Sequence, residues 1–301
     1  MDYNFEMETY LKQLNPELHR RFRDAMFPMG NGLSKYKMYF PEFTDHTILH
    51  SMNVISFCNR LIGDRLDHLN ADEVYILLMA CYLHDSGMGI TGKDYEAFSA
   101  RIDFGDYFMT HDRTDIPAVI RDFHHEFSAQ FVRKYAAIFD IPSPEHEQAI
   151  VQVVRGHRIT DLTDEREYPA DFRVPDGNSV CLPYLAAIVR LADEIDVAAD
   201  RNPVLLYDIS RLTDDRQIRE NKKVQAVRRL RITDSDFILE VSTSEEEIRA
   251  EIGKLADKMQ STLDYCSAVV SSRTSFTITQ EKVRLESVVD PKNKMCIMND
   301  D

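Results

Sequence analysis

The sequence predicts a mainly α-helical fold with a small α+β appendage at its C-terminal end. Between about residues 40 and 200, apolar residues recur with the three- and four-residue spacing of helices that bury one face. After Pro203 the pattern changes to strand-like alternation in 224–232 and 236–242, an amphipathic stretch in 245–270 and further strand-like sequence in 275–288. We therefore expect a helical domain over residues 1–203 and an α+β appendage over 204–301.

The composition is that of an ordinary globular protein, with 301 residues, 44% hydrophobic and 29% charged. A net charge of −15 disfavours proteins that coat duplex nucleic acid or an anionic membrane. The chain has no signal-like segment and no apolar run of membrane-spanning length, and its five cysteines form no C-x-x-C pair. We expect a cytoplasmic protein with reduced thiols, and its partner could still be a small anion if bound cations offset the acidic surface.

The most informative stretch is the predicted helix over 74–85. Its apolar residues recur at i, i+3, i+4 and i+7, and they are Val74, Leu77, Leu78 and Cys81. His84 and Asp85 continue the same stripe at i+10 and i+11, so the helix places an imidazole and a carboxylate in the interior. Buried polar groups without partners cost several kcal/mol, and a divalent cation is a natural partner for this pair.

Three further helical stretches also place metal-compatible side chains on their apolar faces. His50 aligns with Val54, Phe57 and Leu61, and His46 lies one turn before it. His157 ends the stripe formed by Ile150, Val153 and Val154, and Asp193 shares a face with Ala186, Val189 and Val197. A single inward histidine is usually a satisfied core residue, but several of them favour a metal site. Asp196 is expected to be solvated, or at most to contact a metal ligand without binding the metal itself.

Two histidine-containing segments are harder to interpret. In the helix predicted over 122–139, His124 aligns with one apolar row and His125 with another, so periodicity does not choose between them. The second His-Asp pair, His111–Asp112, lies among polar residues and is expected to be an exposed loop. It belongs to a polar stretch, 86–120, that we expect to be a loop-rich lid or substrate-facing segment.

The inward-facing ligands come from five separate helices, and they are His50, His84, Asp85, His125, His157 and Asp193. Imidazole and carboxylate suit Mn, Mg, Ni, Zn or Fe, and one or two ions are expected. A carboxylate such as Asp85 can bridge two ions, which together activate water and neutralise charge on a phosphoryl group.

These motifs resemble the HD superfamily of metal-dependent phosphohydrolases over residues 40–200. The resemblance rests on Asp-His46-Thr-Ile-Leu-His50, Leu-His84-Asp85-Ser-Gly, His124-His125-Glu, Gly-His157-Arg158 and Leu-Ala-Asp193-Glu. It implies an HD-type helical bundle that hydrolyses phosphate esters, frequently of nucleotides. It also implies that His50, His84, Asp85 and Asp193 are the core ligands, and that His125 and His157 complete a second site. The Gly-Tyr-Pro motif of the cyclic-dinucleotide branch is absent.

We therefore expect a metal-dependent phosphohydrolase acting on a nucleotide or a related phosphorylated metabolite. Asp85, His125 and Arg158 are the expected catalytic residues, and the residues expected to bind substrate are Arg121, Arg158, Lys93, His46 and His124. The alternatives are a di-iron oxygenase of the same superfamily and a nucleotide-binding sensor or docking module without turnover. Assembly into a homo-oligomer is left open.

Overall fold

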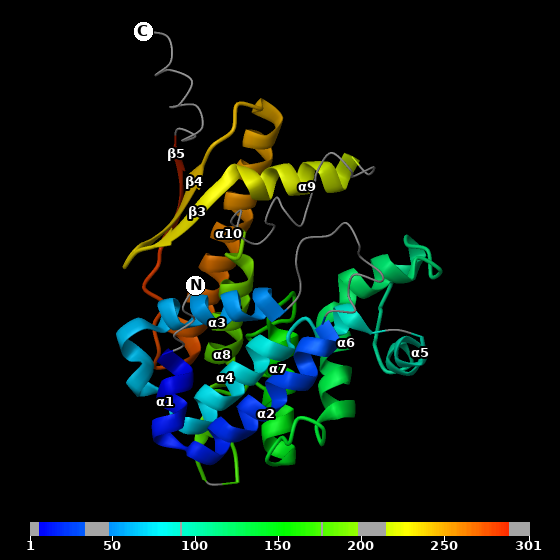
Figure 1. Ribbon diagram of the computed structural model, residues 1–301, viewed down its shortest axis with the longest axis vertical. Coiled ribbons are helices and arrows are strands. Elements are labelled where there is room, and N and C mark those ends of the chain that lie inside the picture. The colour runs from blue at the N-terminus through cyan, green and yellow to red at the C-terminus, as the bar shows by residue number, and fades with distance from the viewer. Residues whose placement is uncertain (1–5, 34–47, 91, 176, 198–214, 289–301) are drawn as a thin grey trace. The chain divides into compact units, whose positions relative to one another are not determined.

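The computed structural model describes residues 6–33, 48–90, 92–175, 177–197 and 215–288, and these are mostly helical (Figure 1). The chain divides into two compact units, Met1–Asp193 with Cys266–Ile278, and Glu194–Tyr265 with Thr279–Asp301. Among the described helices, none is both long and apolar enough to cross a membrane. His46, expected to bind substrate, lies outside the described residues.

The first unit is a helical bundle with a two-stranded hairpin, which agrees with the expected fold class. Its main helices are α1 (Glu6–Leu14), α2 (Pro16–Leu33), α3 (Ile48–Ile62), α4 (Ala71–Leu83), α5 (Lys93–Ser99), α6 (Ile116–Tyr135), α7 (Pro144–Gly156) and α8 (Leu182–Glu194). Short 3-10 turns are η2 (Gly63–His68), η3 (Ser86–Gly89) and η4 (Tyr107–Met109). Strands β1 (Phe172–Arg173) and β2 (Ser179–Val180) pair antiparallel between α7 and α8.

Helix α4 is the centre of this bundle. Asn70 caps its start by accepting from the backbone N–H groups of Asp72 and Glu73, and the Glu73 side chain accepts from the Asn70 N–H in return. Every residue from Asp72 to Leu83 is buried because α1, α2, α3 and α7 all pack against this helix. The expectation of a single buried stripe is therefore wrong for α4, although the placement of its last turn in the interior is confirmed.

The segment expected to be a loop-rich lid has its own helices and hydrophobic core. Residues of η3, α5 and α6 and their connections bury an apolar cluster, Met88, Ile90, Phe98, Ile102, Val119, Ile120 and Phe127. Aromatic rings pack against it, including Phe104 and Phe123, whose centroids lie 4.8 Å apart. In the sequence, polar residues separate these apolar residues, so no helical stripe was recognised in the segment. His111 and Asp112 are exposed, as expected.

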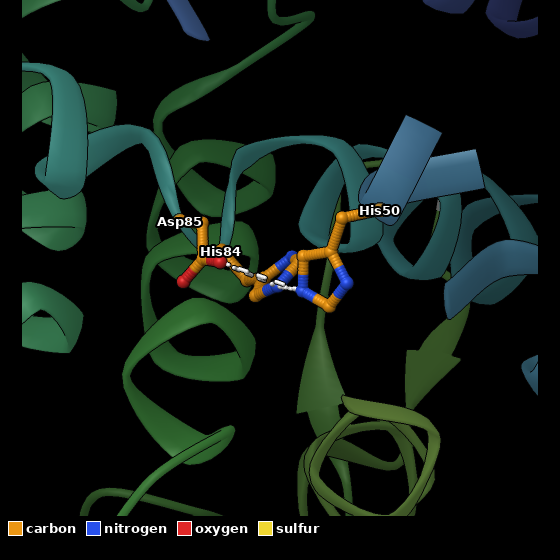
Figure 2. Close-up of side chains that lie close together, drawn as sticks. All are labelled: His50, His84 and Asp85. Atoms are coloured by element: carbon orange, nitrogen blue, oxygen red, sulfur yellow. Dashed lines mark hydrogen bonds and ion pairs between the residues drawn. The ribbon is translucent and has the colours of Figure 1, made fainter. Parts of the chain in front are cut away.

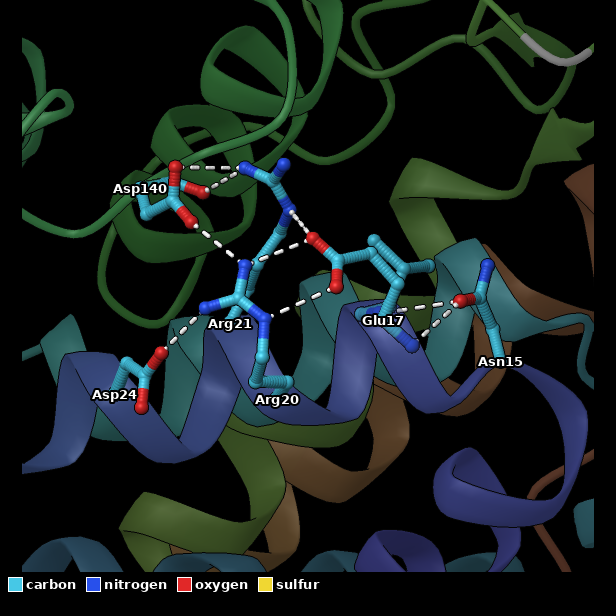
Figure 3. A network of polar contacts seen from close by, with 7 residues as sticks. Asn15, Glu17, Arg20, Arg21, Asp24 and Asp140 are labelled. Atoms are coloured by element: carbon cyan, nitrogen blue, oxygen red, sulfur yellow. Dashed lines mark hydrogen bonds and ion pairs between the residues drawn. The ribbon is translucent and has the colours of Figure 1, made fainter.

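A polar network joins α2 to the turn between α6 and α7 (Figure 3). Arg21 Nη1 lies 2.7 Å from Asp140 Oδ1, and Arg21 Nε lies 2.9 Å from Glu17 Oε1. Arg20 contacts the same two acids, Glu17 at 2.8 Å and Asp140 at 3.2 Å. Because most of these groups are exposed, each pair contributes about 0–1 kcal/mol. The network mainly fixes the turn at Asp140, whose φ of 50° is in the left-handed region.

The second unit contains α9 (Asp215–Ala226), β3 (Val227–Ile232), β4 (Asp236–Val241), the greater part of α10 (Glu246–Arg273) and β5 (Lys282–Ser287). The expected hairpin is present, since β3 and β4 pair antiparallel. Strand β5 pairs parallel with β4, and Leu239 on the central strand is aligned with both Leu230 and Leu285. Asp196 is buried in this unit, so the expectation that it is solvated is wrong.

Candidate metal centre

The first ligand group forms where α4 ends. The helix stops at Leu83, His84 is its C-cap, and Asp85 begins the turn that leads into η3. Figure 2 shows His50, from α3, with its ring beside His84 and Asp85. His50 Nε2 lies 3.1 Å from His84 Nε2 and 3.4 Å from Asp85 Oδ2, and all three residues are buried. Their donor atoms all lie close enough together to hold one ion.

Asp193, near the end of α8, adds a second carboxylate to this group. Its Oδ1 lies 3.1 Å from His50 Nε2 and 3.8 Å from His84 Nε2. Burial acts to raise the pKa of the Asp193 carboxyl, but the hydrogen bond with His50 and the charge of His84 outweigh burial and lower this pKa well below its ordinary value. The group therefore combines two imidazoles with two carboxylates. The low pKa of Asp193 keeps that carboxylate ionised at neutral pH.

A second ligand group lies beside the first and shares Asp85 with it. His124 on α6 and His157, the C-cap of α7, face each other with their Nε2 atoms 3.0 Å apart. Asp85 Oδ1 lies 3.5 Å from His124 Nε2 and 3.9 Å from His157 Nε2. The other oxygen of this carboxylate, Oδ2, is the one that faces His50 and His84. Asp85 therefore directs one oxygen at each group, which is the geometry of a bridging carboxylate.

Backbone carbonyls determine the tautomers of three of these histidines. The Nδ1 of His84 lies 2.8 Å from the Cys81 carbonyl oxygen. Those of His124 and His157 lie 2.6 Å from the Arg121 carbonyl and 2.5 Å from the Val154 carbonyl. A carbonyl oxygen only accepts, so each Nδ1 carries the proton, and a neutral ring held in this way has its lone pair at Nε2. Histidines that bind metals are oriented by the same kind of outer hydrogen bond.

The second group cannot be satisfied by its own hydrogen bonds. Burial lowers the pKa of His124 to about 4 and that of His157 well below its ordinary value, so both rings are neutral at pH 7. Their two Nε2 lone pairs then face each other at 3.0 Å with no proton between them. A cation held by these two nitrogens together with Asp85 would give both lone pairs a partner. The donor set of nitrogen and oxygen atoms fits a divalent metal ion.

The structure places His124, and not the expected ligand His125, in the second group. Phe123 has non-helical dihedral angles (φ −113°, ψ 16°), which kink α6 directly before the two histidines. The alignment of a regular helix therefore does not hold across this point. His125 is buried outside the group, with its Nε2 3.9 Å from Glu126 Oε1, and its Nδ1 has no hydrogen-bond partner among the described residues.

The basic residues expected to bind substrate lie in different surroundings. Arg158 has a buried Nε that no described residue pairs with. Its charge acts to lower the pKa of both His124 and His125, so it lies near this pair. Arg121 contributes its carbonyl to His124, while its side chain lies 3.4 Å from Asp122. Lys93 is exposed at the first residue of α5, and the described residues include no contact between it and the ligand groups.

Sequence reasoning did not find two residues that shape the centre. Gly87 lets η3 approach α6, because a Cβ there would lie 2.5 Å from the His124 carbonyl oxygen. Its sequence signal was its position two residues after Asp85, at the end of the motif Leu-His84-Asp85-Ser-Gly. Arg190 precedes Asp193 by three residues on α8 and hydrogen-bonds the turn that holds His157. The hydrogen bond from Arg190 on α8 to Gly156 on α7 shows this contact with the turn, and no local sequence pattern indicates it.

A helical bundle that gathers a His-Asp pair with histidines and an aspartate from other helices has the arrangement of an HD-type domain. The family model HD-CE matches residues 40–274 of this sequence, and the chain therefore belongs to the HD-CE family. This match confirms the resemblance to the HD superfamily. No curated protein and no solved structure matches the chain.

Proposed function

We propose that the protein hydrolyses a phosphate ester of a nucleotide or a related phosphorylated metabolite, using one or two divalent metal ions. The observation that carries this proposal is the orientation of Asp85, whose two carboxylate oxygens each face a separate pair of histidines. Membership of an HD-type family supports the same reaction class. The ligand atoms are compatible with Mn, Mg, Ni, Zn or Fe.

The protein residues divide into those that hold ions and those that meet the substrate. His50, His84, Asp85 and Asp193 would hold the first ion, and Asp85, His124 and His157 the second. Divalent ions at such a site lower the pKa of a bound water and offset the negative charge of a phosphoryl group. The carbonyls of Cys81, Arg121 and Val154 keep the three rings in the tautomer that binds.

His125 and Arg158 are the groups best placed to bind the phosphoryl oxygens. Within the described part of the chain, each has a buried nitrogen without a hydrogen-bond partner, Nδ1 in His125 and Nε in Arg158. Arg155 is a weaker choice because it already pairs with Glu126 at 2.8 Å and Glu167 at 3.1 Å. A guanidinium N–H and an imidazole N–H directed at one anion would orient the ester and stabilise charge on the transferred group.

The test is phosphate release from a panel of phosphorylated metabolites and nucleotides, measured with each of the five metals after the co-purified metal has been identified. We expect metal-dependent turnover of at least one substrate that a chelator abolishes. Asp85→Ala should lose both metal loading and turnover while it remains helical. Asp112→Ala, in the exposed second His-Asp pair, is the matched control and should retain both. Full metal content in Asp85→Ala would contradict the shared role of this carboxylate.

The same ligand chemistry also suits iron, which supports a di-iron oxygenase as the second candidate. Oxygen consumption by the iron-loaded protein with an organic substrate, without phosphate release, would favour it. Saturable nucleotide binding without turnover under every metal would instead favour a sensor or docking module.

A further inference from the structure

We propose that Arg190 is a positioning residue that holds the turn carrying His157 and Arg158, and so fixes the second ligand group relative to the first. This inference rests on the proposed function, because it assigns Arg190 to the ion and phosphate sites described above. Arg190 lies on α8 and is 9% exposed.

The guanidinium of Arg190 contacts both ends of that turn. Its Nε donates to the Gly156 carbonyl over 2.8 Å, and its Nη2 donates to the Thr160 carbonyl over 2.7 Å. These two carbonyls enclose the three residues His157, Arg158 and Ile159. Helix α7 ends at Gly156, so its last carbonyls lack helical partners and require donors from elsewhere. Arg190 supplies such donors from the neighbouring helix.

The close approach of Gly156, the last residue of α7, to α8 brings Arg190 to this position. A Cβ added at Gly156 would lie 2.5 Å from the Ala186 Cβ, so the last residue of α7 approaches α8 as only glycine allows. Ala186 precedes Arg190 by four residues and therefore lies on the same face of α8. In contrast, Ile159 is 79% exposed, so the turn is not held by burial of its own apolar side chain.

The same face of α8 also carries a ligand of the first group. Asp193 follows Arg190 by three residues and lies 3.1 Å from His50 Nε2. One helix thus provides Asp193 to the first ion and hydrogen bonds to the backbone on both sides of His157, a ligand of the second. A displacement of the turn would move His157 away from His124 and move Arg158 away from the substrate anion.

Arginine is required for this role because its planar fork donates in two directions at once. A lysine ammonium keeps the charge but is a single point on a flexible chain, so it cannot hold both carbonyls in the same geometry. Arg190→Lys therefore keeps the positive charge and removes the paired hydrogen bonds, so it tests positioning independently of charge.

The experiment compares Mn²⁺ binding by wild type, Arg190→Lys and the matched control Arg273→Lys. Arg273 also donates to two backbone carbonyls, those of Leu162 and Tyr168, in the loop that follows the His157 turn. These two carbonyls do not enclose His157. Titration calorimetry gives the number and affinity of the ions, and electron paramagnetic resonance detects coupling between two neighbouring Mn²⁺ ions. Binding of inorganic phosphate to the Mn²⁺-loaded proteins reports on Arg158.

In Arg190→Lys we expect the first ion to bind as in wild type and the affinity of the second to fall roughly 10- to 100-fold, as for other outer hydrogen bonds to metal sites. The coupled signal and phosphate binding should weaken with it, whereas Arg273→Lys should keep all three properties. Two ions of wild-type affinity in Arg190→Lys, with an unchanged coupled signal, would overturn the inference.

Two controls keep the inference separate from folding and from the proposed function. If Arg190→Lys does not fold, Arg190→Gln, which retains one N–H donor group without a charge, should show the same selective loss of the second ion, and equal ion affinities would again contradict positioning. Failure of wild type to bind any divalent ion or to hydrolyse any phosphate ester would count against the proposed function, whereas a single ion in wild type would contradict the inference. Selective loss of the second ion in the variant tests Arg190 itself, whatever the substrate.

Discussion

His146 and Asp72 connect the first turns of α7 and α4, with His146 Nε2 2.8 Å from Asp72 Oδ1. The other ends of these two 13-residue helices carry His157 and His84, whose ring centroids lie 5.0 Å apart. The two helices are therefore parallel and joined at both ends. Asn178 donates to the second oxygen of Asp72 over 2.7 Å, and Ser143 Oγ lies 2.9 Å from His146 Nδ1. Both oxygens of the buried Asp72 and both ring nitrogens of the buried His146 therefore have partners.

We expect His146→Ala to lower the free energy of unfolding by about 3 kcal/mol, because it leaves a buried carboxylate oxygen without its partner. Urea unfolding monitored by circular dichroism measures this change. His111→Ala is the control, since His111 is exposed, and should change the stability by less than about 0.5 kcal/mol. Equal effects of the two substitutions would show that the network contributes nothing specific.

The same network predicts a pH dependence of stability at the acidic end. Burial acts to raise the pKa of Asp72, but its hydrogen bonds with His146 and Asn178 outweigh burial and hold this pKa below its ordinary value of 3.8. A carboxyl with a depressed folded-state pKa stabilises the protein above its unfolded-state pKa, and this contribution disappears as the pH falls through the folded-state value. Wild type should therefore lose more stability than Asp72→Asn as the pH falls below about 4. Equal losses of the free energy of unfolding in wild type and Asp72→Asn, measured by urea titration over this pH range, would contradict the contribution of Asp72.

Neighbouring histidines of α6 should give different phenotypes. His124→Asn removes a ligand of the second group, so we expect one fewer bound ion per chain by elemental analysis. His125→Asn should keep the full metal content, because His125 lies outside both groups, and should instead lower kcat/KM by roughly 10- to 100-fold, as expected for a lost charge-assisted contact. Loss of an ion in His125→Asn, with full metal content in His124→Asn, would show that His125 and not His124 is the ligand.

Gly87→Ala should disrupt the contact between η3 and α6. The added Cβ would lie 2.5 Å from the His124 carbonyl oxygen and 2.7 Å from the Ser128 backbone nitrogen, and neither atom can move without moving the helix. We expect a lower melting temperature and weaker binding of the second ion. Gly92→Ala is a useful comparison because a Cβ there meets no atom within 4 Å, although its φ of 48° adds backbone strain. Unchanged ion binding in Gly87→Ala would show that the second ion does not require close contact between η3 and α6.

Periodicity predicted from the sequence that His50, His84 and His157 face the interior, because each lies on a regular helical stripe or directly after one. It did not choose His124 over His125, because each of them aligns with an apolar row of the helix that follows the kink at Phe123. It also did not find Arg190, whose role depends on the approach of Gly156 to α8 and not on any local pattern. The parallel pairing of β5 with β4 was missed for the same reason, since the two strands are separated by the long helix α10.

The central claim is that Asp85 lies between two metal ions, one held with His50, His84 and Asp193 and the other with His124 and His157. Anomalous diffraction from crystals grown with Mn²⁺ tests it most directly. We predict two manganese peaks roughly 3.5–4 Å apart, each within bonding distance of one Asp85 oxygen. Manganese bound elsewhere, or well-ordered crystals whose buried histidines contact no manganese at saturating concentration, would contradict the account.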